Sequence, residues 1–249
     1  METRLMVRAT LTLHCGAVPV TRDELVAYKA PPPEGRWYPV SHSRVLDVVS
    51  ETLRDSGYGI ESERLGVMRD GSRFFGVLKL NSLIADGVSL AVGVRNSTDR
   101  SLSLGFASGH VVWVCDNTAM SAQLLVHRKH TLRGERDFTR RIFEAVAQLA
   151  SFKEQEAARV DRLKGFDLDA DRADALILRA YEKSIVGARE LPQVIREWRD
   201  PQFPDFEPRN GWSLLNCFTT TLRDRAKRHP DKHAVATMRL HALLDPSRN

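Results

Sequence analysis

The chain has 249 residues, of which 42% are hydrophobic and 28% are charged, a composition that excludes a disordered or low-complexity polymer. Its formal net charge of +5 favours acidic partners such as nucleic acid. Three widely spaced cysteines, Cys15, Cys115 and Cys217, make neither a disulfide framework nor a zinc pattern. No run approaches the roughly 20 apolar residues that span a bilayer, and the first residues lack a signal-peptide layout, so we expect a cytoplasmic protein without a membrane anchor.

The N-terminal part of the chain predicts a strand, two helices and a second strand. Residues 5–14 alternate between apolar and polar, as a half-buried strand does. Thr21 and Glu24 have the spacing of a capping box and predict a short helix after them. Apolar residues at helical spacing predict a helix over residues 43–56, with Ser41 or Ser43 as its N-cap, and residues 61–68 read as a strand.

The centre of the chain reads as an antiparallel meander. Short apolar or alternating runs are separated by polar turn residues, which is typical of consecutive strands. The stretch Arg95–Arg100 is expected to be the turn between the second and third of them. These runs are Arg73–Leu80, Val88–Val94, Ser101–Ala107 and His110–Cys115.

The second half of the chain reads as helical. We predict a short helix over residues 118–126 and a long amphipathic helix over residues 137–163, able to pack along the sheet or against a partner. Asp169 is the expected N-cap of the next helix. The remaining predicted helices cover residues 171–186, 192–199, 212–229 and 234–244.

These elements predict the α+β class, with an antiparallel meander and flanking helices in the N-terminal half and a helical C-terminal half. We expect residues 1–135 to form the sheet core and residues 136–249 a helical region on or beside it, either as two units or as a single domain. Sequence motifs for the phosphate-binding loop, the dinucleotide fold and the nucleophile elbow are absent, which weighs against the commonest nucleotide-driven enzymes.

Two polar corners of the predicted sheet carry candidate site residues. Arg95, Asn96, Asp99 and Arg100 combine planar donors with an acceptor, which suits a phosphate or a base, although the same residue types also build ordinary turns. Asp116 and Asn117 precede an expected helix N-terminus, where free amides attract anions, although Asp116 could equally be a simple N-cap.

Two further groups extend the candidate site. His127, Arg128, Lys129 and His130 form a basic run suited to an anionic ligand, and the alternative is a solvated surface. Trp198 could stack on bases beside Arg199, although aromatic residues near prolines more often anchor a loop to the core.

Several blocks, in order, resemble the phage/plasmid-like family known as domain of unknown function 932. The similarity extends over about residues 38–245 and implies a setting in phages, plasmids or integrated elements, without implying an activity. Thr98 stands where the family commonly has histidine, so a role for that imidazole is not expected here. The blocks are residues 93–101 (GVRNSTDRS), 114–117 (VCDN), 128–131 (RKHT), 197–199 (EWR) with Pro201 and Phe206, and 212–219 (WSLLNCFT).

The leading functional hypothesis is a nucleic-acid-binding accessory protein of a mobile element that binds or anneals single-stranded DNA and needs no cofactor. A rival hypothesis is a metal-dependent hydrolase or nuclease, with a divalent ion on Asp99 and Asp116 and with His130 nearby. A third is a structural protein that forms homo-oligomers through the helix over residues 137–163. The nucleic-acid hypothesis assigns binding to Arg95, Asn96, Arg100, Asn117, His127, Arg128, Lys129, His130, Trp198 and Arg199.

Overall fold

A computed structural model describes residues 17–112, 117–223, 225 and 230–245. The strand expected over residues 5–14 lies outside these ranges, as do Cys115 and Asp116. Within them, no helix combines the length and the apolar composition that crossing a bilayer requires.

The sheet is a six-stranded antiparallel meander in which every strand pairs with its neighbours in sequence. This confirms the predicted α+β class and the expected runs Arg73–Leu80 and Val88–Val94. The runs Ser101–Ala107 and His110–Cys115 were expected as two strands, but a single strand, Leu104–Val112, extends across both. The hairpin between the second and third strands turns at Gly71, whose φ of 71° is a conformation that glycine adopts without strain. The strands are β1 (Ala17–Val20), β2 (Ile60–Met68), β3 (Arg73–Ala85), β4 (Val88–Ser97), β5 (Leu104–Val112) and β6 (Asn117–Arg128).

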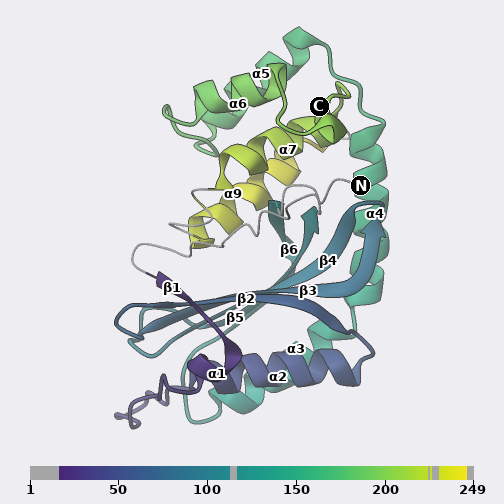
Figure 1. Ribbon diagram of the computed structural model, residues 1–249. Helices are drawn as coiled ribbons and strands as arrows, with labels where there is room; N and C mark the ends of the chain where they lie inside the picture. Colours follow the sequence, from purple (N-terminus) through teal and green to yellow (C-terminus); the bar gives the residue numbers. More distant parts are fainter. Residues whose placement is uncertain (1–16, 113–116, 224, 226–229, 246–249) are drawn as a thin grey trace, which may run out of the picture.

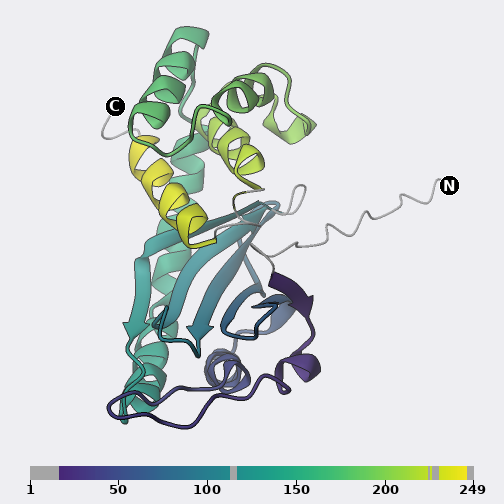
Figure 2. The same ribbon diagram turned by 90° about the vertical axis from the view of Figure 1, so that its left-hand side faces the viewer.

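The helices lie in two groups on either side of the sheet (Figures 1 and 2). In Figure 1, α2 and α3 lie beneath the sheet, α5, α6, α7 and α9 lie above it, and α4 runs along one side between the two groups. The helices are α1 (Arg22–Leu25), α2 (His42–Asp55), α3 (Gly134–Val146), α4 (Leu149–Lys164), α5 (Ala170–Glu182), α6 (Leu191–Arg199), α7 (Gly211–Thr221) and α9 (Pro230–Leu243), with a 3₁₀ turn at Pro204–Phe206.

Local capping signals predicted the helix starts well. Thr21 and Glu24 form both hydrogen bonds of the capping box ahead of α1. The Ser41 hydroxyl accepts from the Arg44 amide and begins α2, and the Asp169 carboxylate accepts from the Arg172 amide and begins α5. These contacts connect residues three apart, so they can be read from sequence.

The prediction of a helix over residues 118–126 is wrong, because this segment belongs to β6. Its run of alanine, methionine, glutamine and leucine favours a helix in isolation. Pairing with β5, from Val112 opposite Asn117 to Leu104 opposite Arg128, supplies hydrogen-bond partners for the strand instead. Tertiary pairing therefore overrides local propensity here.

The single helix predicted over residues 137–163 is two helices, α3 and α4, separated by Ala147 and Gln148. Its apolar positions, including Phe138, Ile142 and Phe152, are buried in the protein's own core. They therefore do not form the seam on which the oligomer hypothesis depended. Two other helices are shorter than predicted, since α5 ends at Glu182 and α7 ends at Thr221.

One cluster of buried apolar side chains runs from the sheet into the helical half. It includes Leu46 of α2, Phe106 of β5, Phe152 of α4 and Phe218 of α7. The sheet and both helix groups are thus joined by a shared core.

Candidate functional site

Three neighbouring strands place Arg95 and His127 on one line across the sheet. Arg95 of β4 lies opposite Gly105 of β5, and Gly105 lies opposite His127 of β6. Directly opposite residues project from the same face, and two strand spacings separate the outer backbones by about 10 Å. Arg95 spans this gap, and its Nη2 donates to His127 Nδ1 at 2.9 Å.

Gly105 allows the Arg95 side chain to extend across β5 to His127. A Cβ at position 105 would lie 2.7 Å from Arg95 Cγ and 2.8 Å from Arg95 Nε, well inside contact distance. The absence of a side chain therefore provides a channel for the guanidinium. Since a guanidinium can only donate, His127 accepts at Nδ1 and carries its proton on Nε2.

The face that carries Arg95 is partly open at this end of the sheet. Val92, Val94 and Asn96 of β4 are buried, whereas the intervening Gly93 and Arg95 are half-buried. Phe75 of β3 lies directly opposite Arg95 and is also half-buried. An aromatic ring thus lies beside the arginine on this face.

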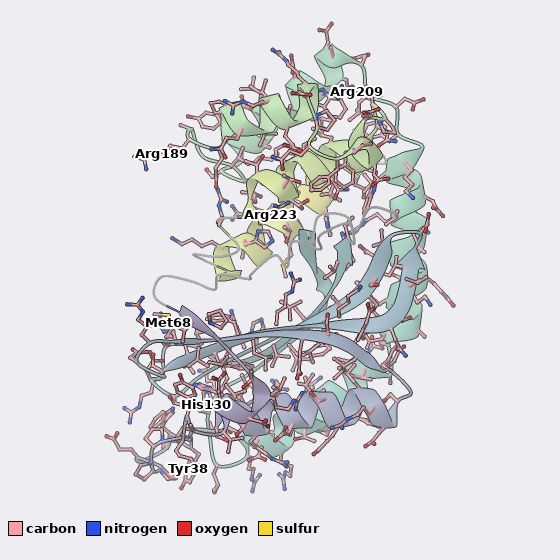
Figure 3. All side chains as sticks on the ribbon, viewed as in Figure 1. Tyr38, Met68, His130, Arg189, Arg209 and Arg223 are labelled. Atoms are coloured by element: carbon pink, nitrogen blue, oxygen red, sulfur yellow. The ribbon has the colours of Figure 1, made fainter. Side chains whose placement is uncertain are left out.

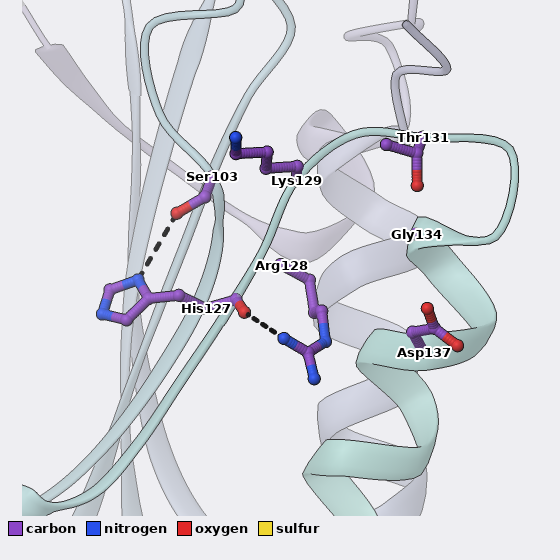
Figure 4. Close-up of a pocket in the computed structure, with 7 residues that line it drawn as sticks. All are labelled: Ser103, His127, Arg128, Lys129, Thr131, Gly134 and Asp137. Carbon is purple, nitrogen blue, oxygen red and sulfur yellow. Dashed lines mark hydrogen bonds between the residues drawn. The ribbon is translucent and has the colours of Figure 1, made fainter. Parts of the chain in front are cut away.

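A pocket of about 480 Å³ opens where β6 leads into α3 (Figure 4). Arg128 lies in it between the strand and the helix, and its Nη1 donates to the His127 carbonyl at 3.2 Å. Gly134 at the helix start fits tightly, because a Cβ there would lie 2.4 Å from the Lys129 carbonyl oxygen. The lining residues are Ser103, His127, Arg128, Lys129, Thr131, Gly134 and Asp137.

We call Arg95, His127, Arg128 and Lys129 the basic edge. Burial and the neighbouring Arg95 cation both lower the pKa of His127, so its imidazole is neutral at pH 7. The three permanent cations of the basic edge are therefore Arg95, Arg128 and Lys129. A surface of this composition can hold two or more phosphate groups.

Asn96 does not belong to this surface, nor to a turn. It lies inside β4 and is fully buried on the α2 side of the sheet. Its Nδ2 donates to the Val40 carbonyl at 2.8 Å and to His42 Nδ1 at 2.9 Å. Because the alternation of β4 turns successive side chains to opposite faces, Arg95 and Asn96 separate.

Asp99 and Arg100 are occupied by partners within their own neighbourhood. Burial raises the pKa of the Asp99 carboxyl. Hydrogen bonds from Ser101 and Arg73 outweigh this effect and lower the pKa to about 2. Arg100 pairs with Glu34 and lies 4.6 Å over the Trp37 ring. Both residues therefore have local partners, and their expected role in ligand binding stays a prediction.

His130 is buried, with 6% of its surface exposed. Its carbonyl accepts from the Tyr38 amide at 3.2 Å, and Figure 3 shows both residues beneath the sheet. Burial lowers the pKa of its imidazole. The basic run therefore presents three residues to the surface instead of four.

Asn117 lies far from the basic edge, because the two are at opposite ends of β6. Asn117 begins this strand and Arg128 ends it. Their partners in β5, Val112 and Leu104, are eight strand steps apart, which is about 26 Å. Asp116 lies outside the described residues, and among those that are described no three His, Cys, Asp or Glu side chains gather where they could hold a metal ion.

Trp198 and Arg199 are also far from the basic edge. Trp198 is 5% exposed, and the Arg209 guanidinium lies 5.0 Å over its ring, so it is not available to stack on a base. Arg199 lies 3.7 Å from Asp174 on the helical side. Figure 3 places Arg209 and His130 on opposite sides of the sheet.

Four residues that the fold brings into play were not among those predicted from the sequence. Ser103 and Asp137 line the pocket, and Phe75 neighbours Arg95. The alternation of β3 was a signal for Phe75, because it separates Phe74 from Phe75. Glu156 was the fourth, since it interrupts the apolar spacing of Phe152 and Val160 and is 3% exposed.

A family model described as a domain of unknown function (DUF932) matches residues 33–244. No curated protein and no solved structure matches the chain.

Proposed function

The chain thus belongs to the DUF932 family, and from the geometry of its surface we propose that it binds single-stranded nucleic acid through the basic edge. The observation that carries the proposal is the line from Arg95 across Gly105 to His127, which continues into Arg128 and Lys129 at the pocket. It gathers three permanent cations from two strands and a loop around the edge strand β6, with Arg95 on the face of the sheet that carries His127 and Arg128 turned toward α3.

The chemistry of the surface matches a nucleic-acid strand better than a small anion. Cations that follow a line can neutralise successive phosphates, and the half-buried Phe75 beside Arg95 offers a face for a base. Single-strand binding proteins combine these two features, because stacking tolerates any base while the cations follow the backbone. The net charge of +5 adds a favourable long-range field.

The resemblance to phage and plasmid proteins supplies the biological setting of the proposal. We place the protein among the accessory factors of mobile elements, where it would bind or anneal DNA single strands in the cytoplasm. This setting rests on the resemblance, whereas binding itself rests on the basic edge.

The proposal is tested by the salt dependence of binding to short DNA single strands, measured by fluorescence anisotropy. Three neutralised phosphates predict a slope of about −2 in a plot of log affinity against log salt. Changing both Arg128 and Lys129 to alanine removes two of these contacts, so the slope should fall to about −0.7.

The matched control is Lys183→Ala, which removes an exposed cation at the end of α5 in the helical half. It should leave both affinity and slope unchanged. Absence of binding at low salt, or equal losses in the control and in the double variant, would refute the proposal.

A further inference from the structure

The pocket beside the basic edge contains a carboxylate that a simple phosphate site does not need. Asp137 lies in the first turn of α3 and lines the pocket together with Arg128 and Lys129. Within the described ranges, Asp137 takes part in none of the ion pairs, whereas its neighbour Glu135 pairs with Arg44. Figure 4 shows the Asp137 side chain on the helix and Arg128 extending from the strand.

The electrostatics of the pocket favour a ligand with both a negative and a hydrogen-donating end. A second negative charge would repel a phosphate, so Asp137 would weaken a pocket that bound phosphate alone. The two oxygens of the Asp137 carboxylate offer hydrogen-bond acceptors to the pocket. The cations and the acceptor therefore address different parts of one ligand.

The size of the pocket fits a nucleotide. Its volume of about 480 Å³ lies within the usual range for small-molecule sites. Ser103 and Thr131 add hydroxyl groups to the lining, which can serve a sugar or a base.

We propose that this pocket receives one guanine nucleotide of the bound strand, with the phosphates on its two sides on Arg128 and Lys129 and its base edge on Asp137. Guanine presents an imino and an amino donor side by side on its pairing edge, and two parallel donors match the two oxygens of a carboxylate. Adenine and cytosine present a single amino donor next to a ring acceptor, which faces the carboxylate unfavourably. The inference rests on the proposed function, because the strand delivers the nucleotide.

The test compares thymine oligonucleotides of about 12 residues that carry one central guanine, hypoxanthine, adenine or abasic site. The strand with guanine should bind the wild-type protein about tenfold more tightly than the other three, since hypoxanthine lacks the amino donor. Asp137→Asn should abolish this preference and leave the salt slope unchanged. Glu135→Gln, two residues before Asp137 and outside the pocket lining, is the control and should retain the preference.

The outcomes separate this inference from the proposed function. Equal affinity of the wild-type protein for all four strands, with a steep salt slope, overturns the guanine pocket and leaves strand binding intact. If guanosine monophosphate binds in calorimetry more tightly than the adenosine compound while no strand binds, the pocket stands and strand binding falls. Absence of binding in both measurements overturns both.

Discussion

Asn96 joins the sheet to the segment that leads into α2. Its side-chain amide donates to Val40 and to His42 Nδ1, and the His42 Nε2 in turn donates to the Gly71 carbonyl at 2.9 Å. Because Asn96 occupies Nδ1, the proton of His42 resides on Nε2. The Asn96 amide thus determines the tautomer of His42 and also joins β4 to the segment before α2.

Asn96→Ala should lower the free energy of unfolding by about 3 kcal/mol, because it leaves two buried acceptors without a donor and opens a small cavity. Urea denaturation monitored by circular dichroism measures the change. The control is Gln193→Ala on the exposed side of α6, which should change stability by less than about 0.5 kcal/mol. Equal stability of the two variants would contradict this role for Asn96.

At the level of elements, a buried polar cluster joins β5 to α4 and α9. His110 Nδ1 lies 2.8 Å from Glu156 Oε1, and Arg159 donates to both Glu156 and His241. The His110 ring lies 5.7 Å from the Trp212 ring and 5.9 Å from the His241 ring. Burial raises the pKa of the Glu156 carboxyl. His110 and Arg159 together outweigh this effect and lower the pKa, so the carboxylate stays ionised.

Glu156→Ala should cost about 3–5 kcal/mol of stability, because it leaves the half-buried Arg159 cation without its carboxylate. Thermal unfolding measures the loss. Glu154→Ala removes an exposed carboxylate from the same helix and is the matched control, with little effect expected. Similar melting temperatures for the two variants would show that the cluster does not hold these elements together.

At the level of the whole molecule, buried histidines make stability depend on pH. Burial lowers the pKa of both His42 and His130, and burial with nearby Arg159 lowers the pKa of His241 well below its ordinary value of 6.5. In the unfolded chain these groups take up protons near pH 6.5, whereas in the folded protein they do so only at lower pH. Their contribution to stability is therefore complete above pH 6.5 and is lost as the pH falls below it.

The free energy of unfolding should thus decrease between pH 7 and pH 5, by up to about 1.4 kcal/mol per pH unit for each histidine that stays neutral in the folded state. Urea denaturation at several pH values measures the slope. His42→Gln should make the slope shallower even if it lowers stability at every pH. A stability that is constant from pH 7 to pH 5 would contradict this account.

The sequence alone was sufficient for the fold class, for the strands β2, β3 and β4 and for the starts of α1, α2 and α5. These features depend on contacts between residues close in the chain, such as the Thr21 capping box or the alternation around Phe74. The basic run at His127 was visible for the same reason. Local chemistry and periodicity can be read directly from the order of residues.

Only the tertiary structure decided which of the polar residues share a surface. Alternation separates Arg95 from Asn96, but the packing of α2 determines which of them is buried. The pairing with β5 converts a helix-favouring segment into β6, and it thereby places Asn117 and Arg128 at opposite ends of one strand. The contact between Arg95 and His127 depends on the register of three strands, and register is a relation between distant segments that no local pattern encodes.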